Sequence, residues 1–190
     1  NQIQFFSMVS SSVSNAVPLL MEKFKNTGAA ATETAYDNAG CLKNMEAIRT
    51  ALMAYAAKND GKFPEKSGFV GFEALIKDFG LNPANAVENE ESAYVPGKEF
   101  TADNCSYILL GGLTQKDNPK LPVVIDWPYN HDGTINAILV DGTVQTIQLD
   151  GTESCKRIVS FLHTQYKYSE EDFNRLMKIA NELDSLYDIN

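Results

Sequence analysis

Apolar residues recur every three or four positions along residues 41–58, which is the clearest periodic pattern in the chain. This spacing predicts an amphipathic helix with one buried stripe, formed by Cys41, Met45, Ile48, Leu52 and Tyr55. Small residues beside the stripe leave room for a second packed layer: Ala47, Ala51 and Ala54. The remaining face is polar and is expected in solvent, with Lys43, Glu46, Arg49 and Lys58. We call this segment the spine helix.

Both ends of the spine helix carry boundary signals. Asp37 or Asn38 offers a side-chain oxygen to the N–H groups of the first turn. At the other end, Asn59-Asp60-Gly61 tolerates left-handed backbone and Pro64 prevents the helix from resuming. The pattern therefore predicts a helix that stops close to Lys58.

Four short runs rich in Ile, Val, Leu and Tyr predict strands at 105–110, 121–127, 134–140 and 143–149. The last three are separated by two Asp-Gly pairs, Asp132-Gly133 and Asp141-Gly142. Asp-Gly between apolar runs favours tight hairpin turns, in which both central residues have positive φ. These runs predict an antiparallel meander.

The other segments complete an α+β architecture, with the spine helix packed on the meander and additional helices at both ends. Residues 1–36 are expected to form an N-terminal helical segment and linker, with a helix over 5–24 that is interrupted near Pro18. Residues 37–150 would form the α+β domain, which includes a short helix at 69–79 and an acidic loop at 82–104. Residues 151–190 would add two helices, the second of them capped by Ser169.

Composition and charge exclude several classes of function. The 190 residues include 16 basic and 25 acidic side chains, so the net charge of −9 repels phosphate backbones and anionic lipid headgroups. No run of about eighteen apolar residues is present, so nothing in the sequence is expected to span a bilayer. The chain begins at Asn1 without a methionine, which suggests that a leader or an anchor was removed.

Three cysteines, Cys41, Cys105 and Cys155, give an odd count without paired metal-binding spacing. In an oxidising compartment we expect one disulfide and one buried thiol. Cys41 fits the apolar stripe, and a thiol behaves as a small apolar group. A Cys105–Cys155 bond is therefore slightly favoured over pairs that involve Cys41.

His131 is the main candidate for site chemistry, because Asp126, Asp132 and Asp141 are near it in the sequence. A histidine with several carboxylates can bind a metal or act in acid–base catalysis. Asp132 and Asp141 are already explained as turn residues, so we expect His131 to be a structural clamp. No known catalytic or nucleotide-binding motif is present, so neither enzymatic activity nor a cofactor is predicted. Oxygen ligands in the acidic loop leave calcium binding open.

The spine helix and one later motif resemble bacterial type IV pilin-like proteins and the pseudopilins of type II secretion. The resemblance covers residues 38–149 and rests on Cys41-x-x-Asn44, Tyr55-Ala56, Asn59-Asp60-Gly61 and Pro64. His131, nine further residues and then Asp141-Gly142 match the His-x9-Asp-Gly signature of a prepilin-like subgroup. Resemblance to the major pseudopilins would also imply calcium in the acidic loop, but no ligand residues here are matched to theirs.

This resemblance implies a non-enzymatic structural subunit of a secretion or pilus-type assembly. Its partners would be other pilin-like subunits or secretion-system proteins, and no nucleic acid. Its head would lie in the periplasm or at the cell surface, anchored in the inner membrane by a segment absent from this chain. Two alternatives stay open: a secreted or lipid-anchored binding module with a pilin-like fold, and a metal-dependent enzyme centred on His131.

Overall fold

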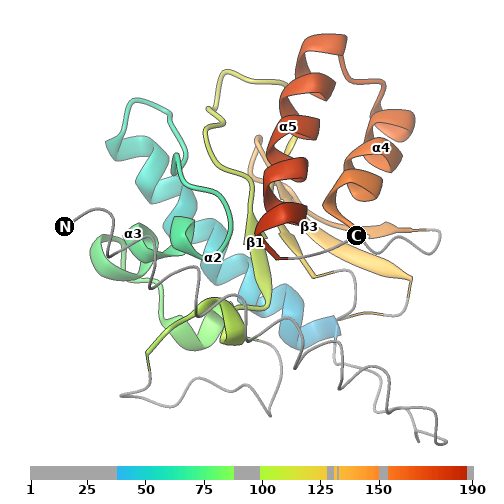
Figure 1. Cartoon of the computed structure of the whole chain (residues 1–190). Helices are drawn as coiled ribbons and strands as arrows, with labels where there is room; N and C mark the ends of the chain where they lie inside the picture. The colour runs from blue at the N-terminus through green and yellow to red at the C-terminus, as the bar shows by residue number, and fades with distance from the viewer. Residues whose placement is uncertain (1–37, 88–98, 128–130, 132, 150–153, 188–190) are drawn as a thin grey trace, which may run out of the picture.

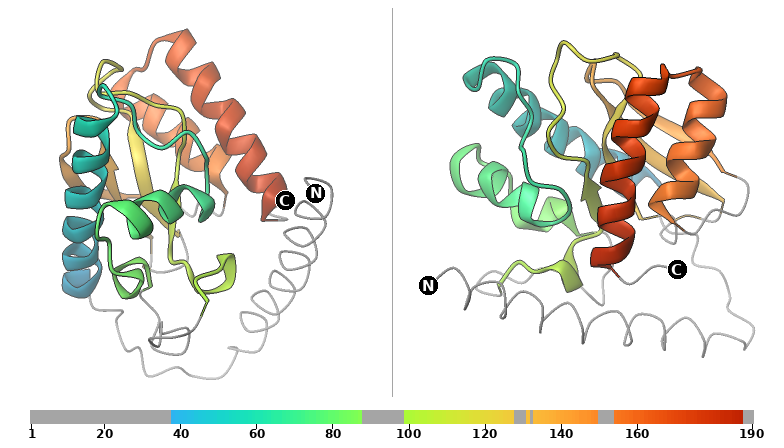
Figure 2. Two further views of the ribbon diagram at one scale, coloured as in Figure 1. Left: turned by 90° about the vertical axis from the view of Figure 1, so that its left-hand side faces the viewer. Right: turned by 45° about the horizontal axis from the view of Figure 1, so that its top comes forward.

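Helices lie on both faces of a four-stranded antiparallel sheet (Figures 1 and 2). The structure, a computed structural model, describes residues 38–87, 99–127, 131, 133–149 and 154–187. The predicted N-terminal helix and linker, the Asp37 cap and residues 88–98 of the acidic loop lie outside these residues. No helix in the described part of the chain has both the length and the apolar character needed to cross a membrane.

The four predicted strands are confirmed, each with slightly shorter ends. They are β1 (Tyr107–Leu109), β2 (Pro122–Asp126), β3 (Thr134–Leu139) and β4 (Val144–Gln148). Their spatial order, β1-β2-β3-β4, is that of an antiparallel meander. Nearly every residue of β2 and β3 is buried, which indicates that both faces of the central strands are covered.

The β3–β4 turn differs from the predicted type. Only Gly142 has a positive φ, +81°, so the turn is not the two-residue type in which both central residues are left-handed. The Gly142 N–H donates to the Leu139 carbonyl, and the Leu139 N–H donates to the Thr143 carbonyl. This pattern is typical of a three-residue loop that ends in a left-handed glycine. Asp141 Oδ1 accepts from the Thr143 N–H at 2.8 Å and stabilises the loop from its side chain.

Asp132-Gly133 does not connect β2 and β3 directly as a two-residue hairpin turn, although the Thr134 N–H does donate to the His131 carbonyl. β2 ends at Asp126 and β3 begins at Thr134, so the connection covers residues 127–133. Gly133 does have a positive φ, +68°, and its carbonyl accepts from the Leu149 N–H. The longer connection allows His131 to reach back to the buried end of β2.

The spine helix is confirmed as α2, Asn38–Lys58. It ends as predicted, because Asp60 and Gly61 have φ values of 54° and 79°. The short helix predicted at 69–79 is confirmed as α3, Val70–Asp78. Two short 3-10 turns, η1 (Pro83–Ala86) and η3 (Ala102–Asn104), lie within the predicted loop at 82–104, near its two ends.

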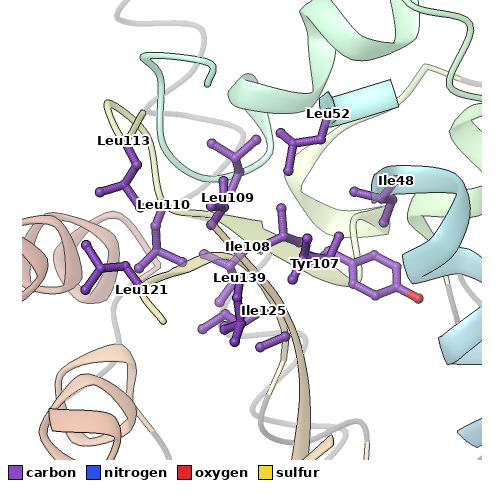
Figure 3. Packing of buried hydrophobic residues seen from close by; sticks show 14 of the residues in the cluster. Ile48, Leu52, Tyr107, Ile108, Leu109, Leu110, Leu113, Leu121, Ile125 and Leu139 are labelled. Carbon is purple, nitrogen blue, oxygen red and sulfur yellow. The ribbon is translucent and has the colours of Figure 1, made fainter. Parts of the chain in front are cut away.

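The apolar stripe of α2 faces the sheet, with one exception. Cys41, Met45, Ile48 and Leu52 are almost completely buried, and Ile48 and Leu52 join the same cluster as strand residues such as Ile108 (Figure 3). Tyr55, by contrast, is only partly buried, and its ring packs against Phe79 with 5.1 Å between centroids. A stripe with a spacing of three and four residues rotates gradually around the helix axis, because an α-helix has 3.6 residues per turn. At this end of α2 the buried residue is therefore Ala56.

The two C-terminal helices cover the opposite face of the sheet (Figure 2). They are α4 (Cys155–Tyr166) and α5 (Glu170–Leu186), and the Ser169 side chain caps α5 as predicted by accepting from the Asp172 N–H. Asn136 and Thr146 face α2, so the alternating strand residues Ile125, Ile135 and Ala137 point toward α4 and α5. The helices beyond residue 150 therefore complete the core of the sheet.

Candidate functional site

A cluster of polar side chains is buried between the start of α2 and the sheet. Cys41 comes from the first turn of α2, Asp126 from the last residue of β2 and His131 from the connection that follows. Asn136 lies on β3 and Tyr107 on β1. All five are at most 8% exposed, so the cluster is sealed from bulk water. We call these residues the Cys41 cluster.

Cys41 and Asp126 are joined directly and through Asn136. The Cys41 thiol lies 3.4 Å from Asp126 Oδ2. Asn136 Nδ2 lies 3.1 Å from Cys41 Sγ and 2.9 Å from Asp126 Oδ2. The Tyr107 hydroxyl approaches Cys41 Sγ from β1 at 3.7 Å. Two donors, Asn136 Nδ2 and the Tyr107 hydroxyl, thus approach the sulfur, and the thiol itself donates to Asp126.

The orientation of the Asn136 amide is fixed from both ends. Its backbone N–H donates to Asp126 Oδ1 at 2.9 Å, and Thr146 Oγ1 donates to its Oδ1 at 2.6 Å. These bonds determine which end of the amide is the donor toward Cys41 and Asp126. The adjacent strands β2, β3 and β4 therefore hold the carboxylate in one geometry.

His131 completes the cluster, with Nε2 3.2 Å from Asp126 Oδ2. Asp126 has no exposed side-chain surface, and a carboxylate in that position needs hydrogen bonds and a compensating positive charge. His131 supplies that charge when it is protonated. The His131 side chain therefore lies beside a carboxylate, and its role as a structural clamp stays a prediction.

The order of the three groups fits binding better than catalysis. In a nucleophilic triad the histidine lies between the thiol and the acid, so that it can remove the thiol proton. Here Asp126 lies between Cys41 and His131, with its Oδ2 in contact with both. A sulfur, a nitrogen and a carboxylate oxygen from these residues all lie within 4.8 Å of one another. This is a donor set that transition metals accept.

The structure separates Asp141, another sequence candidate, from this cluster. Asp141 is exposed at the far end of β3, where it pairs with Lys120 at 3.6 Å. Asp132 lies outside the described residues. The His-x9-Asp-Gly signature therefore brackets β3, with His131 in the Cys41 cluster and Asp141-Gly142 in the β3–β4 turn.

Both ends of this signature lie against α2. At one end a ring nitrogen of His131 lies within 4.8 Å of Cys41 Sγ, and at the other Met53 Cε would lie only 3.3 Å from a Cβ placed on Gly142. Between them, Asn136 of β3 contacts Cys41. Helix α2 and strand β3 therefore lie side by side.

Sequence reasoning missed Cys41, Asn136 and Tyr107 as members of the site. Cys41 was assigned to the apolar stripe, which is correct as a description of its burial. The available signal was the presence of Asp126 and Asn136 within strands that are otherwise apolar. Buried polar residues require partners, so two of them on neighbouring strands indicate a shared network.

The expected Cys105–Cys155 disulfide is not formed. Both residues are buried thiols, and Cys105 Sγ donates to the Tyr107 carbonyl at 3.1 Å. Burial raises the pKa of Cys105 to about 12. Burial and then the nearby Asp184 carboxylate raise the pKa of Cys155. Each thiol is stabilised in its protonated form and is therefore a poor nucleophile.

A shallow hollow lies beside α2, away from the Cys41 cluster, between its small residues and the segment that follows α3. It is lined by Ala47, Thr50, Ala51, Phe79, Gly80, Leu81, Asn82 and Asn85. No charged or nucleophilic side chain lines it beyond the Thr50 hydroxyl, which donates to the Glu46 carbonyl. The hollow offers no chemistry for catalysis.

Comparison of the chain with protein-family models, with curated proteins and with solved structures found no match.

Proposed function

We propose that the chain is the globular head of a pilin-like or pseudopilin-like subunit, a non-enzymatic component of a secretion or pilus-type assembly. The observation that carries this proposal is the pairing of α2 with β3. Close approaches of α2 at both ends of the His-x9-Asp-Gly signature, Cys41 to His131 and Met53 to Gly142, hold one long helix along an antiparallel meander. A head attached to a filament through its spine helix needs that helix to be fixed rigidly to the sheet.

The cluster chemistry supports a structural role over an enzymatic one. Cys41 is 2% exposed, and Asp126 rather than His131 accepts from its thiol in the contact described above. A catalytic residue has to meet a substrate, whereas a clamp is most stable when it excludes water. In this proposal the Cys41 cluster fixes the start of α2, which is the end from which the spine of a pilin-like protein would continue.

The test is made on the complete gene product. The reading frame upstream of Asn1 is expected to encode a short basic leader and about twenty apolar residues, with Glu at the fifth position of the mature protein. Co-expression with a prepilin peptidase should shorten the product by the length of the leader. Crosslinking in the native host should then recover complexes with other pilin-like subunits.

Other results would select the alternatives. A signal peptide that ends in a cysteine and receives a lipid would favour the lipid-anchored binding module. A cleaved secretory signal without any apolar anchor would favour a secreted module. Either result, or a product that the prepilin peptidase does not process, contradicts the proposed function.

A further inference from the structure

The three side chains that meet between α2 and the β2–β3 connection have the composition of a metal site. We propose that Cys41, Asp126 and His131 bind one divalent transition metal ion, with zinc as the best match, and that the ion fastens the start of α2 to the sheet. This inference does not depend on membrane anchoring or filament assembly. It requires only the contacts within the Cys41 cluster.

The spacing of the donor atoms fits a tetrahedral ion. At the tetrahedral angle, zinc ligands at about 2.0 Å for oxygen or nitrogen and about 2.3 Å for sulfur lie about 3.3 Å apart for an oxygen–nitrogen pair and about 3.5 Å apart for a pair that includes sulfur. Cys41 Sγ and Asp126 Oδ2 are 3.4 Å apart, and His131 Nε2 and Asp126 Oδ2 are 3.2 Å apart. The sulfur and nitrogen lie within 4.8 Å of each other, so binding of the ion requires them to approach by at most about 1.3 Å.

The donor types select the kind of ion. A thiolate and an imidazole bind zinc, cobalt and related ions well, whereas calcium and magnesium prefer oxygen ligands. A divalent ion also balances the charges of one thiolate and one carboxylate, both buried. When the ion binds, the Cys41 sulfur exchanges its proton for a bond to the metal, and the proton passes to the buffer.

The surrounding residues already orient the ligands as an outer shell would. Asn136 holds Asp126 through its backbone N–H and its amide, and Thr146 fixes that amide. The Tyr107 hydroxyl and Asn136 Nδ2 both approach Cys41 Sγ. Such partners fix ligand geometry and typically contribute about 10- to 100-fold to metal affinity.

The decisive experiment is a cobalt titration of the reduced, chelator-treated 190-residue chain. Cobalt serves as the spectroscopic probe, and zinc is then added in competition. The proposal predicts one cobalt ion per chain, a thiolate-to-cobalt charge-transfer band, the visible spectrum of a tetrahedral complex, and displacement by zinc. If the wild-type protein binds cobalt without the charge-transfer band, or does not bind one cobalt ion per chain, the proposed site is contradicted without any variant.

Variants then assign the ligands. Cys41→Ser should abolish the charge-transfer band, and Asp126→Asn and His131→Gln should each weaken binding at least tenfold. Tyr107→Phe should keep the band but weaken binding about 10- to 100-fold, as expected of an outer-shell partner. His163→Gln and Cys105→Ala are the matched imidazole and thiol controls, and both should bind cobalt as the wild type does. Circular dichroism of every variant establishes that it is folded, and a folded Cys41→Ser variant that retains the band contradicts the assignment.

Discussion

The side chains of Cys41 and Asn136 meet at 3.1 Å although 95 positions separate them in the sequence. This contact joins the first turn of α2 to the central strand β3. Because Asn136 also holds the Asp126 carboxylate, one amide side chain links a helix and two strands. The buried polar network is therefore placed where the spine helix meets the sheet.

Truncation of Leu52 tests the packing of the spine helix. Leu52 is fully buried, so Leu52→Ala is expected to lower the free energy of unfolding by about 2 to 5 kcal/mol, through lost contacts and a partly collapsed cavity. Lys43→Ala and Arg49→Ala, on the polar face, should change it by no more than about 0.5 kcal/mol. Denaturant unfolding of the three variants makes the measurement. Equal, small effects would mean that the sheet does not cover the stripe.

Removal of the Asn136 amide tests the polar network. Asn136→Ala takes away one hydrogen bond to a fully buried carboxylate and is expected to cost about 3 kcal/mol in unfolding free energy. Thr146→Val removes a single bond to that amide and should cost only about 1 kcal/mol. The comparison is made by denaturant unfolding at neutral pH. A loss at Asn136 no larger than that at Thr146 would contradict the role assigned to the amide.

The helix and the strands were predictable from the sequence because their signals are local. The three-to-four-residue period of α2 and the alternation of the strands depend on neighbours within a few positions. The Cys41 cluster was not predictable in the same way, since its geometry comes from four elements that only the fold brings together. Asp126 and His131 could be named from the sequence, but Cys41 was assigned only to the apolar stripe.

The length of the β2–β3 connection was not predictable from the sequence for a related reason. An Asp-Gly pair indicates a turn, but the length of the connection depends on where the flanking strands stop pairing. After β2, pairing stops at Asp126, where the carboxylate turns inward to Asn136. The connection is therefore longer than the Asp132-Gly133 pair indicates.

Alanine substitutions at two glycines separate backbone strain from crowding. Gly142 and Gly112 have φ values of +81° and +80°, but only Gly142 has a neighbour within 4 Å of a new Cβ, the Met53 side chain. Both variants should lose about 1 to 2 kcal/mol of stability from the left-handed backbone. They should agree within about 0.5 kcal/mol, because the end of the Met53 side chain can move. Thermal or denaturant unfolding is the measurement, and an effect at Gly142 alone would mean that crowding dominates.

The Asp117–Arg175 pair gives a pH dependence. Partial burial opposes ionisation of Asp117, but hydrogen bonds from Arg175 and Thr114 outweigh it and lower the pKa of this carboxyl. The stabilisation is therefore fully present above the unfolded pKa of about 3.9, and it is lost as the pH falls through the lower folded value. Arg175→Gln should cost about 1 kcal/mol at pH 7, and the difference from wild type should shrink toward pH 2. A difference that does not change with pH would contradict this assignment.

Thiol labelling tests the burial of the three cysteines. The folded, metal-depleted protein is expected to react slowly with an alkylating reagent, because Cys41, Cys105 and Cys155 are all buried. In denaturant without reductant, all three should be alkylated, as counted by mass spectrometry. A crosslinked peptide that contains Cys41, from protein purified from an oxidising compartment, would show that the stripe assignment fails.

The position of α4 and α5 has a consequence for synthesis of the chain. All four strands leave the ribosome before the two helices that cover one face of their sheet. At about 5 to 20 residues per second, the helices follow roughly 2 to 7 s later. During that interval Ile125, Ile135 and Ala137 have no native cover, so the nascent chain presents an apolar surface of the kind that chaperones bind. Any early termination near residue 150 would leave that surface permanently exposed.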